Sequence, residues 1–203
     1  MSSELSLEIA AAAARWVVEE GMEYGPAKRR AARDLFKSGT GRSTRRAELP
    51  SNDEVETEVR AYLQLFCADT QPGELAALRA VAVLWMQRMK DFRPHLSGAV
   101  WRGTATRLNN IHLQLYCDDS KAAELALIDQ GVDYEVSSLT GPRGDEISVL
   151  SCSSPCRALN ENVTVHMSVL DHDDLRGGLK PDAHGRTERG DLKVLRALME
   201  SSS

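Results

Sequence analysis

The spacing of apolar residues changes along this chain, from helical steps in about the first 90 residues to alternation in the rest. Steps of three and four residues place apolar side chains on one face of a helix, whereas alternation places them on one face of a strand. The first pattern predicts helices over residues 4–20, 26–37, 51–66 and 72–90. The second predicts strands over residues 110–117, 132–138, 146–151 and 163–170. Two further helices are expected among these strands, over residues 121–130 and 191–199.

Local signals agree with these helix limits. Gly21 and Gly25 end the first helix, and Pro26 suits the first turn of the second. Ser51 and Glu54 have the spacing of a capping box at the start of the third helix. The side chains expected to face the core from the third and fourth helices are Val55, Val59, Tyr62, Leu63, Phe66, Leu75, Leu78, Ala82, Trp85, Met86 and Met89.

Together these elements predict an α+β protein. A helical region over residues 1–93 would contain a basic, flexible linker at about residues 38–50, which is rich in Gly, Ser, Thr and Arg. A small mixed β-sheet domain would follow over residues 94–203. Four helices must pack on one another or on the sheet to bury their apolar faces.

Composition indicates a globular protein. The chain has 203 residues, of which 42% are hydrophobic and 27% are charged. No apolar run approaches the roughly 18 residues that a membrane-spanning helix needs. Glu4 and Glu8 precede the alanine run at residues 10–14, so this run lacks the basic start of a signal peptide. We therefore expect a cytoplasmic protein with no membrane partner.

Charge is concentrated in one segment. Residues 26–48 contain eight Lys and Arg residues and two acidic residues, a net charge of +6, within a chain whose formal net charge is −5. A solvated helix face followed by a mobile linker would explain this excess, and the lack of interleaved aromatic residues favours that interpretation. Alternatively, the region from Lys28 to Arg46 binds the phosphates of a nucleic acid.

Candidate chemistry lies between Gly98 and Leu113. A glycine turn leads through a short link into the strand at residues 110–117. Alternation places Asn110 and His112 on the same face of this strand, opposite its apolar residues. These two polar side chains should project together beside the glycine turn.

This segment resembles the signature of the nucleotidyltransferase superfamily, particularly its small bacterial members. In that family Gly-Ser, a short connection and Asp-x-Asp follow one another on a turn and a strand. Two aspartates and a third carboxylate hold divalent metal ions against a nucleoside triphosphate, and the serine contacts a phosphate. Gly98 and Ala99 match the Gly-Ser element, and residues 102–106 match the connection. Asn110 and His112 match the two aspartates of Asp-x-Asp.

The resemblance implies roles for further residues. It places the third carboxylate on the strand after the next helix, where Asp133 is the matching position and Glu135 lies on the same face. The implied catalytic positions are thus Asn110, His112 and Asp133, and the implied metal ligands are Asp133 and Glu135. Gly98, Ala99 and Arg102 would contact the nucleotide, and magnesium would be the cofactor.

The substitutions change the expected chemistry. Magnesium favours charged oxygen ligands, whereas an asparagine oxygen carries no charge and an imidazole suits zinc or copper better. We therefore predict a nucleotidyltransferase-fold protein with a degenerate metal site and a nucleotide-binding or regulatory role. One alternative is an active nucleotidyltransferase with a rearranged site that uses Asp133, Glu135 or an acid from residues 171–174. A ferredoxin-like protein-interaction module is the other.

Three weaker signals remain. Residues 176–189 form a glycine-bearing basic loop in which Lys180 and Arg186 are candidate phosphate ligands. His166 and His172 could form a metal site with a nearby cysteine, but their spacing matches no established zinc pattern. We expect all four cysteines, Cys67, Cys117, Cys152 and Cys156, to be structural thiols. A redox pair of Cys152 and Cys156 is the alternative.

Overall fold

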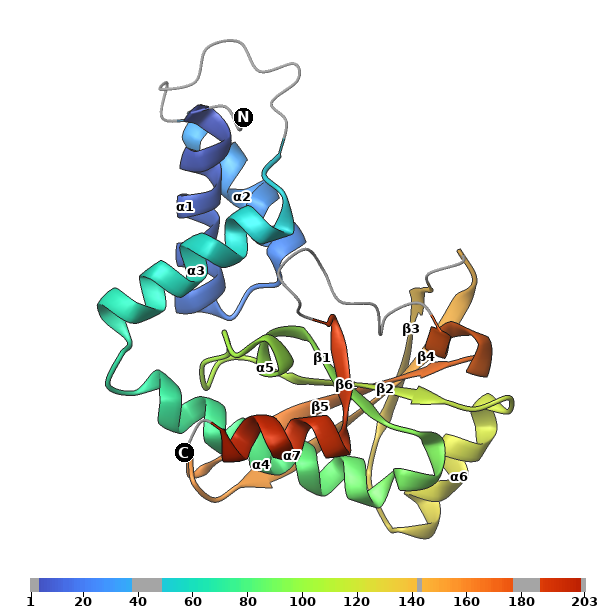
Figure 1. Cartoon of the computed structure of the whole chain (residues 1–203). Helices are drawn as coiled ribbons and strands as arrows, with labels where there is room; N and C mark the ends of the chain where they lie inside the picture. Colours follow the sequence, from blue (N-terminus) through green and yellow to red (C-terminus); the bar gives the residue numbers. More distant parts are fainter. Residues whose placement is uncertain (1–3, 38–48, 142–143, 177–186, 202–203) are drawn as a thin grey trace. The chain divides into compact units, whose positions relative to one another are not determined.

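The computed structural model describes residues 4–37, 49–141, 144–176 and 187–201. Contacts divide the chain into two compact units. Unit 1 comprises Met1–Pro72 and Thr104–Asn109, and unit 2 comprises Gly73–Gly103 and Asn110–Ser203. Helices in unit 1 and a mixed sheet with helices in unit 2 confirm the predicted α+β class (Figure 1). Residues 38–48, which hold most of the expected basic linker, lie outside the described residues.

Unit 1 contains α1 (Glu4–Glu20), α2 (Tyr24–Lys37) and α3 (Asn52–Phe66). Both α2 and α3 pack against α1. The facing positions are rich in alanine, which allows the helix backbones to approach closely. Residues buried in this core include Ile9, Ala10, Ala13, Ala14, Val17, Ala27, Ala31, Val55, Val59 and Leu63.

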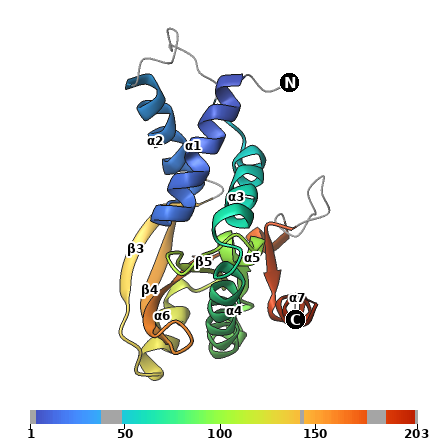
Figure 2. The same ribbon diagram turned by 90° about the vertical axis from the view of Figure 1, so that its left-hand side faces the viewer.

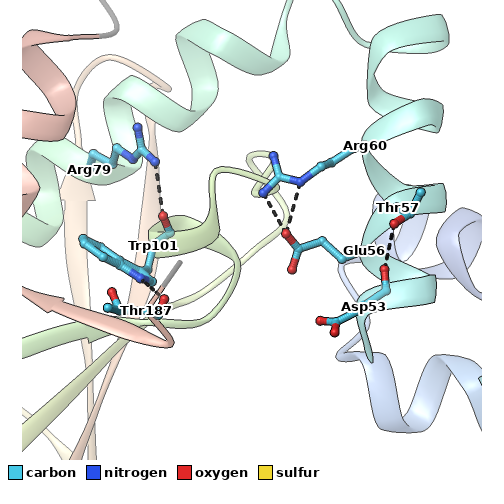
Figure 3. Close-up of polar contacts among 7 residues, drawn as sticks. All are labelled: Asp53, Glu56, Thr57, Arg60, Arg79, Trp101 and Thr187. Carbon is cyan, nitrogen blue, oxygen red and sulfur yellow. Dashed lines mark hydrogen bonds and ion pairs between the residues drawn. The ribbon is translucent and has the colours of Figure 1, made fainter. Parts of the chain in front are cut away.

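Helix α3 begins with the predicted capping box. The Glu54 backbone N–H donates to Ser51 Oγ at 3.1 Å, and the Ser51 backbone N–H donates to Glu54 Oε2 at 2.6 Å. Further along α3, Arg60 Nη2 donates to Glu56 Oε1 at 2.7 Å (Figure 3). Phe66, which was expected to face the core, is 69% exposed.

Unit 2 is built on one sheet. Its strands are β1 (His95–Ser97), β2 (Ile111–Tyr116), β3 (Glu135–Thr140), β4 (Glu146–Cys156), β5 (Glu161–Leu170) and β6 (Arg189–Asp191). Within the described residues the strand order is β3-β4-β5-β2-β1-β6. Only the β2 and β5 pair is parallel among these neighbours. The predicted mixed sheet is therefore present.

This strand order differs from that of a ferredoxin-like sandwich. In that fold, the two strands after the first helix form a hairpin whose second strand lies beside the strand that preceded the helix. Here β3 and β4 form such a hairpin after helix α6 (Ser120–Asp129), but β5 lies between β4 and β2. The ferredoxin-like alternative does not fit this topology.

Helix α4 (Gln71–Arg88) belongs mostly to unit 2. Trp85 is 2% exposed, and its Nε1–H donates to Ser154 Oγ on β4 at 2.8 Å. This bond joins α4 to β4, and Figure 2 shows α4 beside the sheet. The contacts thus divide the chain near residue 72, rather than at the expected boundary between residues 93 and 94.

Several short elements were not predicted. They are the 3-10 turns η1 (Lys90–Phe92) and η2 (His172–Arg176), strands β1 and β6, and helix α5 (Gly98–Arg102). Strand β3 begins three residues later than expected, and all of its residues are exposed. The final helix, α7 (Leu192–Glu200), lies close to its predicted range. None of the described helices has the length and apolar character required to cross a membrane.

Candidate functional site

The register of the sheet brings polar residues from all six strands into one row. Residues that pair directly across neighbouring strands point to the same face of a sheet. The row begins at Glu135 on the β3 edge and ends at Arg189 on the β6 edge. From β3 to β6 its members are Glu135, Ser151, His166, His112, Ser97 and Arg189.

Gly98 lies next to the middle of this row. Its φ of +72° favours glycine, because side chains rarely adopt that conformation. A β-carbon at Gly98 would lie 3.5 Å from His112 Cδ2, so the glycine turn and His112 are neighbours, as predicted. Ala99 and Arg102 follow in α5 and are half-buried.

A buried arginine holds α5 behind this turn. Arg79 on α4 is 6% exposed, and burial lowers the pKa of its guanidinium. Its Nε donates to the Val100 carbonyl at 3.2 Å, and its Nη2 donates to the Trp101 carbonyl at 3.3 Å (Figure 3). A cation is favourable at the end of a helix, where carbonyl groups lack helical partners. Arg79 is therefore a positioning residue for the Gly98 turn.

His166 is the centre of a hydrogen-bonded cluster. Its Nε2 lies 3.1 Å from Asn110 Nδ2, and its Nδ1 lies 2.8 Å from Ser151 Oγ. An amide nitrogen can only donate, so Nε2 accepts from Asn110. In this assignment the imidazole is neutral, and its Nδ1–H donates to Ser151.

His112 stacks on this cluster. The His112 and His166 rings lie 5.1 Å apart between centroids, with 27° between their planes. Both residues are half-buried, whereas Asn110 is exposed. The sequence thus correctly placed Asn110 and His112 together, but it did not place His166 and Ser151 beside them.

The expected third carboxylate is not brought to this cluster. Asp133 lies before the start of β3, and Glu135 is the first residue of that strand. Strands β4 and β5 separate β3 from β2, a spacing of about 14 Å across three strand intervals. A metal ion needs ligands at about 2 to 2.6 Å, so these acids cannot share one with Asn110 and His112. The expected convergence of Asp133 with the other two positions is wrong.

Other predicted ligands contribute little to the cluster. The described residues contain no group of three or more His, Cys, Asp and Glu side chains that could hold a metal ion. Lys180 and Arg186 lie outside the described residues. His172 Nε2 lies 4.0 Å from Asp118 Oδ1, apart from the histidine pair.

All four cysteines are thiols rather than disulfides. Cys152 and Cys156 are buried on β4, four residues apart, which corresponds to about 13 Å along a strand. A disulfide requires α-carbons within about 7 Å, so the strand geometry prevents the redox pair that the spacing suggested. Burial also raises the pKa of Cys152 to about 11, which keeps its thiol protonated.

No protein-family model matches the sequence, and no curated protein is significantly similar to it. Among solved structures, the chain is similar to the Cid1 poly(U) polymerase with MgGTP bound, with 13% sequence identity and a TM-score of 0.35. The match covers 50% of this chain, and the chain spans 33% of the polymerase chain. A likeness of this size does not define a site.

One sequence signal for His166 existed. Alternation along the strand at residues 163–170 put Thr164, His166 and Ser168 on its polar face. Their neighbours across the sheet depend on strand order, which alternation does not specify. Asn110 and His166 are separated by 56 residues and meet because β2 and β5 are parallel neighbours.

Proposed function

We propose that the polar side chains grouped around His166, beside Gly98, bind the phosphate groups of a nucleotide without a catalytic metal. We call Asn110, Ser151, His112 and His166 the histidine cluster. The observation that carries the proposal is that these side chains, none of which is a carboxylate, are held together beside a glycine turn, where a nucleotidyltransferase would keep its metal-binding carboxylates.

Donor chemistry supports a role that does not require magnesium. Imidazole and amide groups are poor magnesium ligands, but they hydrogen-bond phosphate oxygens directly. No carboxylate in this cluster would repel a phosphate, and the nearest acid in the row, Glu135, is two strand positions from His166. The buried Arg79 adds positive charge behind the turn.

Calorimetric titration of the full chain with ATP, GTP, CTP and UTP tests the proposal. We expect one or more of these to bind in the presence of a chelator, with affinity changed little by magnesium or manganese. His166→Ala removes the centre of the cluster and should weaken binding by about tenfold for each hydrogen bond to the nucleotide that it disrupts. His172→Ala is the matched control, because it removes a histidine from η2, outside the row.

The outcomes separate the alternatives. Failure of all four nucleotides to bind, or equal binding by His166→Ala, would refute the proposal. Nucleotide transfer by the wild type that needs magnesium or manganese would instead favour the active-enzyme alternative.

A second candidate function belongs to unit 1, where α2 carries a cationic face. A hollow of about 550 Å³ lies along this helix, and its lining includes four cations, Arg29, Arg30, Arg33 and Lys37, and one acid, Asp34. Arg30 is oriented by the Trp16 ring, whose centroid is 3.6 Å from the guanidinium carbon. Arg29, Arg33 and Lys37 recur every four residues, about 6 Å along the helix. We infer that this face binds nucleic-acid phosphates.

Lys28 has a different role from these residues. Its Nζ donates to the Pro50 carbonyl and to Asn52 Oδ1, each at 2.9 Å, and so joins α2 to the start of α3. Substitution of Arg29 and Arg33 by Glu should weaken binding to generic RNA and DNA. The slope of log K against log salt concentration should become shallower by about 0.7 to 0.9 for each phosphate that is no longer neutralised. Arg196→Glu on α7 is the matched control. Unchanged affinity and salt dependence for the double variant would reject this candidate.

A further inference from the structure

Unit 2 contains a second hollow that neither candidate function uses. It has a volume of about 440 Å³ and lies among the end of α4, the start of β1 and the start of α7. This volume lies within the range of small-molecule sites. Apolar side chains form part of its lining, namely Met86, Pro94, Leu175 and Leu192.

The other lining residues are mostly cationic. Lys90, Arg93 and Lys193 line the hollow and are exposed at its rim. Among the described residues, none of these three forms an ion pair. Asp191 is the one acid in the lining, and its Oδ1 accepts from the Val194 backbone N–H at 2.8 Å to cap α7. The local charge is therefore positive, with three cations and one committed carboxylate.

A buried histidine completes the lining. His95 is 7% exposed, and its Nδ1 lies 2.8 Å from the Arg93 carbonyl. Because a carbonyl only accepts, Nδ1 carries the proton, and Nε2 of the neutral ring is an acceptor. Burial and the charge of Arg189 lower the pKa of His95, which favours this neutral form. The ring is held edge-on to Tyr116, with centroids 5.4 Å apart.

We infer that this hollow binds a small organic anion that carries a phosphate monoester or carboxylate on an apolar, ring-sized body. Lys90, Arg93 and Lys193 would bind the anionic group, and the apolar side chains would contact the body of the ligand. His95 would accept a hydrogen bond from a hydroxyl or N–H of the ligand. The site is distinct from the histidine cluster, because none of the residues that line the hollow belongs to that cluster.

NMR titration of the full, isotope-labelled chain tests this inference. The probes are phenyl phosphate, benzoate, inorganic phosphate and the neutral analogue phenol. We expect phenyl phosphate to shift the resonances of His95, Leu192 and Lys193, and to bind at least about tenfold more tightly than either inorganic phosphate or phenol. Benzoate compared with phenyl phosphate distinguishes a carboxylate site from a phosphate site.

Variants identify the groups responsible. Lys90→Ala with Lys193→Ala should weaken the binding of the preferred anion by about tenfold for each charged hydrogen bond removed. Arg93 has a φ of +46°, so Arg93→Gly removes the guanidinium and keeps a suitable backbone. Arg196→Ala on the same helix as Lys193 is the matched control and should bind like the wild type.

Two results would overturn the inference. One is the absence of shifts around the hollow with both phenyl phosphate and benzoate. The other is equal affinity of the wild type and the Lys90→Ala, Lys193→Ala variant for the anion that binds. Neither result would affect the proposal for the histidine cluster, because the probes lack a nucleoside and that proposal is tested by nucleotide titration.

Discussion

The contact between Trp85 and Ser154 provides a quantitative test of how α4 packs on the sheet. Trp85 is 2% exposed, Ser154 is 3% exposed, and the indole N–H donates to the hydroxyl at 2.8 Å. Three substitutions separate the contributions: Trp85→Ala removes the ring, Ser154→Ala removes the acceptor, and Trp85→Phe removes the donor while it keeps an aromatic ring.

Each substitution has an expected cost. Trp85→Ala deletes a large buried ring and should lower the free energy of unfolding by about 3 to 5 kcal/mol. Ser154→Ala leaves a buried N–H without an acceptor, which should cost about 1 to 3 kcal/mol. The double variant Trp85→Phe, Ser154→Ala removes both partners, so its cost should be less than the sum of the costs of Trp85→Phe alone and Ser154→Ala alone by about 0.5 to 3 kcal/mol.

Urea unfolding, followed by circular dichroism for helix loss and by NMR signals of unit 2, measures these changes. The second probe is needed because two compact units need not unfold in a single transition. The matched control is Leu84→Ala on the same helix, where Leu84 is 49% exposed and the cost should be small. If Trp85→Ala changed unit 2 by no more than Leu84→Ala does, or if the cycle showed strict additivity, α4 would not pack as described.

Three further predictions concern the sheet. Gly190→Ala should destabilise unit 2 by about 1 to 3 kcal/mol in urea unfolding, because a β-carbon there would collide with the Trp101 ring; an unchanged midpoint would contradict this packing. Cys152 should react with a thiol reagent at pH 8 only after unfolding, since burial raises its pKa to about 11, and rapid labelling of the native protein would contradict this. The contribution of the buried Cys152 thiol to the free energy of unfolding should be full below about pH 8.5 and should decline as the pH rises towards 11. The triple variant in which Asp replaces Asn110, His112 and His166 should be stabilised against heat by magnesium, because its third carboxylate comes from β5, beside β2. The double variant Asn110→Asp, His112→Asp lacks that carboxylate and should not respond, so equal responses of the two variants to magnesium would disprove this arrangement.

Much of the local structure followed from residue patterns. The Ser51 and Glu54 capping box and the limits of α1 were predictable because caps and amphipathic faces depend on residues close in sequence. Where a pattern ended at a helix terminus the prediction was less reliable, and Phe66 is exposed rather than buried. Short elements such as β1 and β6 carry too few residues to show a period.

The candidate site was predictable only within one strand. Asn110 and His112 share a face because side chains alternate, and the glycine turn precedes them in sequence. The resemblance placed the third position on the strand after α6, at Asp133, but the chain passes through β3 and β4 before β5 reaches β2. His166 therefore takes the neighbouring place, a result that no local pattern specifies.

Residue patterns along the chain were enough to specify the α+β class, most helices, the polar face of β2 and the charge excess of the basic segment, because these depend on neighbouring residues. Tertiary structure alone decided the order of strands, the grouping of α4 with the sheet, and the two groupings of distant residues that carry the proposals. The histidine cluster joins residues 56 positions apart, and the second hollow joins α4, β1 and α7. Such contacts arise when whole elements bury their apolar faces against one another, and many strand orders can satisfy the same alternation.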